Sequence, residues 1–116
     1  MNRRSRGATG EDEAQAYLES QGYSILARNY RTRRGEVDLV ARRGDRLAFV
    51  EVKSWLSYQA DSLEYAIGAW KRRRIVEVSR SFLLKHPQPE GVRIAYDVIL
   101  LGRGRVNHIQ DAFPGV

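Results

Sequence analysis

The chain has 116 residues and a formal net charge of +6, with 20 Lys and Arg against 14 Asp and Glu. This length suits one domain of about 100–150 residues, and the absence of cysteine excludes disulfides, thiol nucleophiles and zinc–thiolate sites. The apolar runs are too short to cross a bilayer, and the basic N-terminus lacks the apolar stretch of a secretory signal, so we expect a cytoplasmic protein without a membrane partner.

A helix is expected near the start of the chain. Thr9 is placed to cap it, because its side-chain oxygen can accept a hydrogen bond from a free backbone N–H of the first turn. Ala14, Tyr17 and Leu18 follow at the i, i+3, i+4 spacing of an apolar helix face, and Gly22 is a typical stop.

Three strands follow this helix. Residues 23–30 form the first, and a basic turn over 31–35 leads to the second at 36–41. Gly44-Asp45 then gives a tight turn before the third strand at 46–53. The second and third of these strands, 36–41 and 46–53, alternate in the side chains that they place on their two faces, which is the pattern of a strand whose faces lie in different surroundings.

A long helix is expected over about 62–85, after a loop at 54–60. Asp61 is placed to cap this helix, and Pro87 with Pro89 ends it. Its buried stripe is expected to consist mainly of four apolar side chains, Ile67, Trp70, Val78 and Phe82.

Two strands complete the chain, over residues 92–101 and 106–110, with a glycine-rich turn at 102–104 between them. The order α-β-β-β-α-β-β predicts an α/β fold in which a mixed sheet is flanked by helices. In this part we expect Asp97 to be a structural polar group and His108 to lie on the surface without a chemical role.

Two acidic side chains are expected to face each other across the second turn. If Gly44 and Asp45 are the central turn residues, Asp38 lies directly opposite Glu51 on one face of the hairpin. Like charges placed opposite each other destabilise a sheet, and apolar neighbours worsen the repulsion by excluding water. The pair therefore needs a raised pKa on one acid, a nearby cation, or a bound divalent metal.

The neutralising group can be a side chain or a metal. Lys53 lies on the same face as Glu51 and can act as a permanent counter-ion, but it cannot balance two acids, and Glu36 adds a third. The carboxylates of Asp38 and Glu51, with the backbone carbonyl of Val52, would give the hard oxygen ligands that suit Mg²⁺ or Mn²⁺. Such a metal would polarise a phosphodiester, and Lys53 would orient the attacking water or stabilise charge in the transition state.

Several segments carry a family resemblance that covers nearly the full chain. They are Gly7–Glu11, Arg28–Arg31, Gly35–Ala41, Phe49–Lys53 and Ile109–Phe113. Asp38, twelve intervening residues and then Glu51-Val52-Lys53 resemble the PD-(D/E)xK nuclease motif. The ordered set of segments resembles the YraN-like bacterial family, which is related to archaeal Holliday-junction resolvases.

The resemblance implies a single nuclease-like domain over residues 1–116, with a restriction-endonuclease-like core. It implies that Asp38 and Glu51 are the metal ligands. It also implies that Lys53 stabilises charge and that Glu11, on the first helix, assists. The family commonly has a basic residue two places after the motif lysine, whereas this chain has Trp55, so either a phosphate contact is missing there or Trp55 stacks on a base.

Basic residues cluster near this acidic centre and indicate a polyanionic partner such as nucleic acid. The resemblance implies that this nucleic acid is DNA. Those just before the carboxylate strand are Arg28, Arg31, Arg33 and Arg34. They either hold phosphates beside the metal or form a solvated turn. In the long helix, the resemblance makes Lys71 a DNA contact. The relation to resolvases further implies a homodimer, because two strands must be cut.

The function expected from the sequence is hydrolysis of phosphodiester bonds with Mg²⁺ or Mn²⁺ as cofactor. The resemblance to resolvases alone implies that the substrate is structured or branched DNA. Two alternatives stay open. One is a nucleic-acid-binding module that keeps the same fold without catalysis. The other is a structural protein in which Asp38, Glu51 and Lys53 only balance one another's charge.

Overall fold

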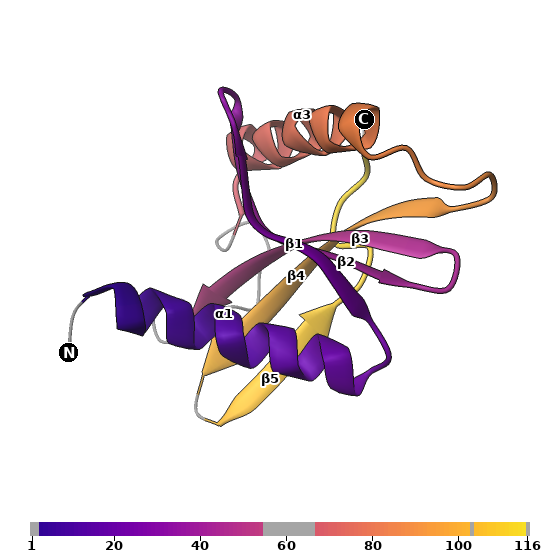
Figure 1. The fold of residues 1–116 in the computed structure, drawn as a ribbon. Helices are drawn as coiled ribbons and strands as arrows, with labels where there is room; N and C mark the ends of the chain where they lie inside the picture. Colours follow the sequence, from indigo (N-terminus) through magenta and orange to yellow (C-terminus); the bar gives the residue numbers. More distant parts are fainter. Residues whose placement is uncertain (1–2, 55–66, 103, 116) are drawn as a thin grey trace.

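The computed structural model describes residues 3–54, 67–102 and 104–115. Its elements are α1 (Arg3–Ser20), β1 (Ser24–Thr32), β2 (Gly35–Arg43), β3 (Arg46–Ser54), α3 (Ala69–Lys85), β4 (Arg93–Gly102) and β5 (Arg105–Ile109). Within these ranges five strands form one sheet in the order β1-β2-β3-β4-β5, in which β3 and β4 are parallel and the other neighbours antiparallel. The helices α1 and α3 cover opposite faces of the sheet (Figure 1), so the predicted α/β fold and order of elements are confirmed. Neither of these helices is long and apolar enough to span a membrane.

The first helix begins earlier than the sequence predicts. The predicted cap at Thr9 is wrong, because α1 starts at Arg3 and Thr9 lies inside it. Arginine is a good helix former and no proline interrupts this basic segment, so the helix extends through it. The end is as predicted, since Gly22 has a φ of 91° and closes a Schellman motif. Ala14 and Leu18 are fully buried against the sheet.

The alternation of side chains breaks in the middle of the β1–β2 hairpin. Asn29 has a left-handed φ of 53°, which asparagine tolerates better than most residues, and it stands across from Asp38. Near this break Val37 packs with Val40 in the core beneath α3, whereas Leu39 belongs to the core beneath α1. Strict alternation, which places Val37 on the same face as Leu39, therefore fails here.

The second described helix begins later than the sequence predicts. Its first residue is Ala69, and Gly68 is its N-cap. The predicted start near residue 62 and the predicted cap at Asp61 lie outside the described residues. The helix ends at Lys85, just before the two prolines, as expected.

The buried stripe of α3 differs from the prediction at Trp70. Val78 and Phe82 are buried as predicted, and Ile75 belongs to the same stripe. Because each helical residue turns about 100°, Trp70 lies about 140° from Ile75 around the helix axis. As a result, 64% of the surface of Trp70 is exposed. Lys71 precedes Ile75 by four residues and so lies on the side of α3 that faces the sheet.

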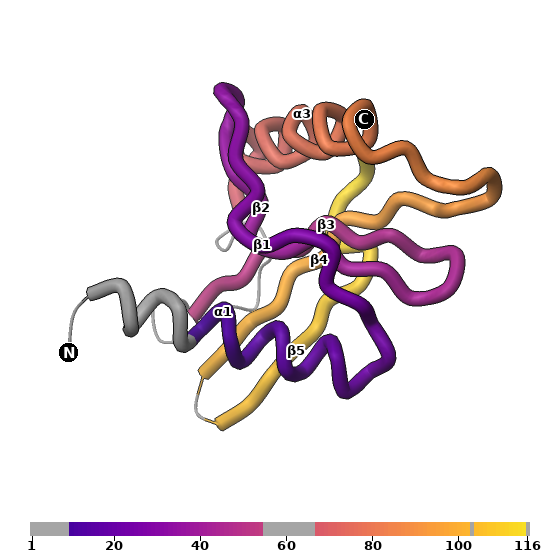
Figure 2. Tube along the Cα trace, in the orientation of Figure 1, coloured from indigo at the N-terminus to yellow at the C-terminus, as the bar shows by residue number. Residues whose placement is uncertain are grey.

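The turn of the β1–β2 hairpin reaches α3 (Figure 2). The backbone carbonyl of Arg34 accepts a hydrogen bond of 2.8 Å from Arg74, and the guanidinium of Arg34 lies 2.6 Å from the carboxylate of Glu77. These contacts hold the hairpin turn beside α3. Arg34 and Arg74 both line a cavity between the two elements.

A buried polar network joins β3, β4 and β5. Asp97 is 0% exposed, and Arg46 donates two hydrogen bonds of 2.7 and 2.9 Å to its carboxylate. Nε2 of His108 lies 2.8 Å from the same carboxylate, and the backbone N–H of Asp111 donates to it at 2.9 Å. The predicted surface position of His108 is wrong, because the buried carboxylate of Asp97 draws the imidazole inward and leaves it 4% exposed.

Replacement of Asp97 by asparagine should destabilise the fold, because the buried guanidinium of Arg46 loses its counter-charge. Burial alone would raise the pKa of Asp97, but hydrogen bonds from His108 and Arg46 outweigh it and hold the pKa below its usual value. A lowered pKa in the folded state adds stability above about pH 4, and this stability is lost as the pH falls. We expect urea unfolding at pH 7 to show a loss of about 3 kcal/mol for Asp97→Asn, shrinking below pH 4. Glu90→Gln, at an exposed turn, is the control, and equal stability of the two variants would contradict this reading of the network.

Candidate active site

The β2–β3 hairpin brings Asp38 and Glu51 together. The strands pair in the predicted register as far as Leu39 opposite Val50. Beyond this pair, Oδ2 of Asp38 accepts a hydrogen bond of 2.8 Å from the backbone N–H of Val52. The Asp38 carboxyl thus accepts a hydrogen bond from the backbone of β3, just beyond the last backbone pair of the two strands. At this position it also interacts with the carboxylate of Glu51.

Burial and a neighbouring charge raise the pKa of Asp38. Loss of solvent is the largest cause, and repulsion by Glu51 is the second. The hydrogen bond from the Val52 N–H acts in the opposite direction, and the charge of Glu11 adds a smaller increase. Together these effects raise the pKa of the Asp38 carboxyl to about 7. One acid of the pair therefore binds a proton far more readily than an exposed aspartate does.

Two lysines lie against Glu51, which is 3% exposed. Its Oε2 is 3.4 Å from Nζ of Lys53 and 2.6 Å from Nζ of Lys71. Desolvation lowers the pKa of Lys71, but the hydrogen bond to Glu51 and its charge outweigh that effect, so the pKa lies above its usual value. Lys53 is on the predicted face of β3. Lys71 reaches the site from α3, which strand spacing could not indicate.

The same atoms offer a divalent cation a partial set of ligands. Among the described residues, no three Asp, Glu, His or Cys side chains group closely enough to hold a metal by themselves. Asp38 and Glu51 supply two carboxylates. The N–H and C=O of one residue in an extended strand point the same way, so the Val52 carbonyl faces β2 as its N–H does. Mg²⁺ is often bound through one or two carboxylates and keeps several waters, so this set fits Mg²⁺ or Mn²⁺ if the cation displaces Lys71 from Glu51.

Asn29 connects two further acids to this region. Its Nδ2 donates a hydrogen bond of 2.9 Å to Glu11 and another of 3.3 Å to Glu36. Glu11 lies on α1, which covers the face of the sheet opposite to α3. Through its hydrogen bond with Asn29 it reaches the edge of the site. The sequence reading missed Asn29. The available signal was an asparagine within a strand, since asparagine is one of the few residues that adopt a left-handed backbone readily.

The predicted basic residues divide into two groups. One cavity beside Glu51 is lined by four of them, Arg31, Arg33, Arg34 and Lys71. Arg28 points toward α1 instead, where it lies 2.6 Å from Asp12 and 3.6 Å from Glu11. The acids of α1 thus draw Arg28 away from the cavity. Trp55, the other predicted contact to nucleic acid, lies outside the described residues.

Comparisons with known proteins assign the chain to a family and leave its activity open. The model of the uncharacterised protein family UPF0102 matches residues 10–101. A UPF0102 protein of Lachnoclostridium phytofermentans is 42% identical over 113 residues, which cover 97% of this chain and 96% of that protein. A UPF0102 protein of Azorhizobium caulinodans is 46% identical, covering 94% of this chain and 82% of the relative. One from Chloroflexus aurantiacus is 44% identical, covering 85% and 80%.

Replacement of Asp38 by asparagine should stabilise the metal-free protein at alkaline pH. A raised pKa means that the folded state binds a proton more tightly than the unfolded chain, so stability falls as the pH rises from about 4 to about 7 and then levels off. Without the carboxyl, this loss disappears. We expect urea unfolding in chelator at pH 8 to show Asp38→Asn more stable than the parent by roughly 2–4 kcal/mol, with little difference at pH 4.

The matched control is Asp45→Asn, which removes an exposed acid from the turn of the same hairpin. Its stability should follow that of the parent at every pH. Lower stability of Asp38→Asn at pH 8 would contradict the expected repulsion, because it would mean that the ionised carboxylate stabilises the fold.

Proposed function

The chain belongs to the UPF0102 family, and we propose that it is an endonuclease that hydrolyses DNA phosphodiester bonds with Mg²⁺ or Mn²⁺ as its cofactor. The observation that carries this proposal is the pairing of the half-buried Asp38 with the buried Glu51, whose Oε2 lies 3.4 Å from Nζ of Lys53. Adjacent buried carboxylates destabilise a sheet, and they are suited to binding a divalent cation. The resemblance of their order and spacing to the PD-(D/E)xK motif supports the same function.

Asp38, Glu51 and the carbonyl of Val52 would hold the cation. When bound, the cation supplies charge that polarises a phosphodiester and lowers the pKa of a water. On the protein side, Asp38 must release its proton, and Glu51 must give up its contact with Lys71. Because the pKa of Asp38 is about 7, activity should decline as the pH falls below neutrality.

Lys53 would stabilise charge in the transition state. Its side chain is 23% exposed, so most of it is buried but solvent still reaches part of it. A protonated amine fixed at this place can balance the negative charge that develops on the phosphate. Partial exclusion of water strengthens this attraction.

Glu11 has a positioning role in this proposal. Its carboxylate accepts a hydrogen bond of 2.9 Å from Asn29 and lies 3.6 Å from Arg28, and its charge contributes to the raised pKa of Asp38. Glu11 therefore adds negative potential around the proposed metal ligands and helps to fix the strand that carries Asn29.

A nucleic-acid-binding module without catalysis is the second candidate. It is favoured by the two lysines, Lys53 and Lys71, because their ammonium groups lie close enough to Glu51 to balance its charge. In that case the basic cavity would hold the phosphate backbone, and Asp38 would stay protonated up to about pH 7. A branched DNA substrate and a homodimer rest on the resemblance to resolvases alone.

Purified protein should cleave labelled DNA in Mg²⁺ or Mn²⁺, and a chelator should abolish the cleavage. Single-stranded, linear duplex and four-way substrates would be compared. Asp38→Asn and Lys53→Ala should each lower the rate by at least about 100-fold, since the first removes a charged ligand of the cation and the second removes the positive charge beside the reacting phosphate. Asp45→Asn should cleave like the parent. Equal cleavage by all these proteins would indicate a contaminant, and binding without cleavage in either metal would favour the non-catalytic module.

Mn²⁺ should raise the melting temperature of the protein, and the rise should depend on Glu51. A ligand that binds only the folded state stabilises it in proportion to the logarithm of its concentration, by about 2.7 kcal/mol at 100 times its Kd. Differential scanning fluorimetry of Glu51→Gln should show no Mn²⁺-dependent rise. Glu90→Gln, at an exposed turn, should keep the rise of the parent. The same rise in both variants would place Mn²⁺ elsewhere.

A further inference from the structure

Trp70 is an exposed aromatic side chain beside a strongly basic cavity. It lies in the first turn of α3 with 64% of its surface exposed, although an indole of this size is usually buried. The guanidinium of Arg74 lies over the ring, 4.4 Å from its centroid, and donates a hydrogen bond to the carbonyl of Arg34. Arg74 therefore covers one face of the indole, and a base that stacks on Trp70 would use the other face.

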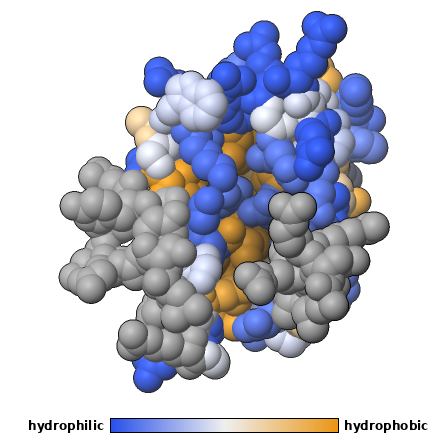
Figure 3. Space-filling view, turned by 90° about the vertical axis from the view of Figure 1, so that its left-hand side faces the viewer, coloured by the Kyte–Doolittle hydropathy of each residue, from blue (hydrophilic) through white to orange (hydrophobic). Residues whose placement is uncertain are grey.

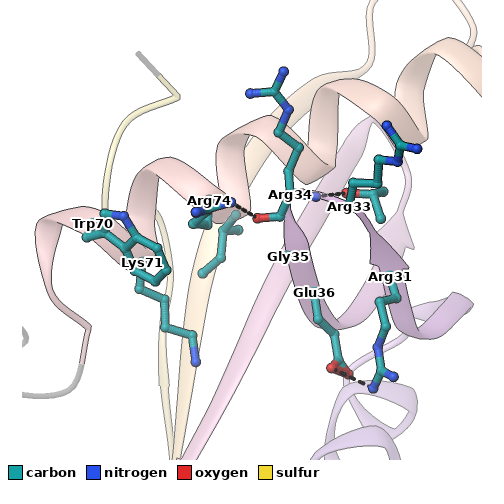
Figure 4. Close-up of a pocket in the computed structure, with 10 residues that line it drawn as sticks. Arg31, Arg33, Arg34, Gly35, Glu36, Trp70, Lys71 and Arg74 are labelled. Atoms are coloured by element: carbon teal, nitrogen blue, oxygen red, sulfur yellow. Dashed lines mark hydrogen bonds and ion pairs between the residues drawn. The ribbon is translucent and has the colours of Figure 1, made fainter.

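The cavity beside Trp70 has a volume of about 510 Å³. It opens between α3 and the β1–β2 turn, and Figure 4 shows Trp70 and Lys71 on the α3 side and Arg31 with Glu36 on the hairpin side. Five cationic side chains line it against one carboxylate, that of Glu36. The cations are Arg31, Arg33, Arg34, Lys71 and Arg74. The surface over α3 and the hairpin turn is largely hydrophilic, and apolar surface is visible below it (Figure 3).

Lys71 joins this cavity to the proposed active site. Its side chain lines the cavity, and its Nζ lies 2.6 Å from Oε2 of Glu51. A molecule seated against Trp70 would therefore have its neighbouring groups close to the acidic pair. Arg31 stands on the other side and already holds a carboxylate, since its Nη2 is 3.0 Å from Glu36.

We propose that this cavity binds one unpaired nucleotide of a single-stranded or locally opened nucleic acid, with the base stacked on Trp70 and the phosphates held by the surrounding arginines and Lys71. Stacking on an aromatic ring accepts any base, and arginine forks bind phosphate oxygens. A volume of about 510 Å³ is sufficient for a nucleotide-sized ligand. The inference rests on the proposed function for the class of ligand, and it adds that the substrate presents an unpaired base next to the bond to be cut.

A fully paired duplex fits this arrangement poorly. Its bases are stacked on one another, so an indole at the protein surface reaches a base only when that base leaves the stack, which costs a few kcal/mol. Charge alone would attract duplex and single strand alike. The exposed indole is the feature that distinguishes them.

The test is a binding titration in chelator with a twelve-nucleotide oligothymidine. In a Trp55→Phe background Trp70 is the remaining tryptophan of the two in the sequence, so its fluorescence reports stacking directly. We expect the oligonucleotide to quench this fluorescence. With a fluorescein-labelled strand, Trp70→Ala should weaken binding about 5- to 100-fold, and Trp70→Phe should restore most of the affinity. Arg93→Ala, which removes an exposed arginine outside the cavity, should change affinity less than about twofold.

An abasic strand of the same length separates stacking from charge. It carries the same phosphates without bases, so it should bind the parent and Trp70→Ala equally and cause no quenching. The inference is overturned if Trp70→Ala binds oligothymidine as tightly as the parent, or if the abasic strand, a blunt duplex or an acidic peptide binds the parent as tightly as oligothymidine. If Trp70→Ala fails to fold, quenching of Trp70 by oligothymidine and not by the abasic strand decides the question.

The binding results do not depend on cleavage, because the chelator removes the divalent cation that the proposed cleavage needs. Stacking on Trp70 without hydrolysis in any metal would support the nucleotide site and contradict the proposed nuclease. Metal-dependent cleavage that Trp70→Ala leaves unchanged on single-stranded, duplex and four-way DNA would support the nuclease and contradict the nucleotide site.

Discussion

The candidate site depends on how the repulsion between Asp38 and Glu51 is relieved. The β2–β3 hairpin places the two carboxyls side by side. Because burial removes water from around them, ionising both costs more free energy than it would at the surface. The Asp38 carboxyl accepts a hydrogen bond from the Val52 N–H and has a pKa raised to about 7, whereas two lysines neutralise Glu51. The proton that Asp38 binds and the amine of Lys71 are the groups that the proposed divalent cation would displace.

Buried charges are paired differently at the two ends of β3. At the start of the strand, Arg46 and Asp97 form a bidentate pair that His108 completes, so the charges are satisfied within the protein. At the other end, Glu51 meets a second carboxyl and depends on amines from β3 and α3. A fully hydrogen-bonded network fixes the sheet at one end of β3. The acidic end is where we propose that a cation binds.

The phase of α3 connects the acidic pair to the basic cavity. Because Ile75 and Val78 face the sheet, Lys71 also turns inward and reaches Glu51, while Trp70 turns outward. The first turn of α3 therefore contacts Glu51 through Lys71 and presents the exposed indole of Trp70 to solvent. The hairpin turn, held by Arg74, completes the cavity. The proposed substrate contacts therefore come from two elements separated by the whole of β3 in the chain.

Local patterns in the sequence determined the order of elements, the turn at Gly44-Asp45 and the register that places Asp38 near Glu51, because strand pairing around a tight turn is a short-range property. The sequence also contained the lysine on the face of Glu51. Only the tertiary structure decided the pKa of Asp38, the contact of Lys71, the bridging by Asn29 and the exposure of Trp70. The first three depend on burial and on contacts between residues far apart in the chain, which leave no periodic signal in it. The exposure of Trp70 depends on which side of α3 packs against the sheet, and the tertiary structure fixes that side at Ile75 and Val78.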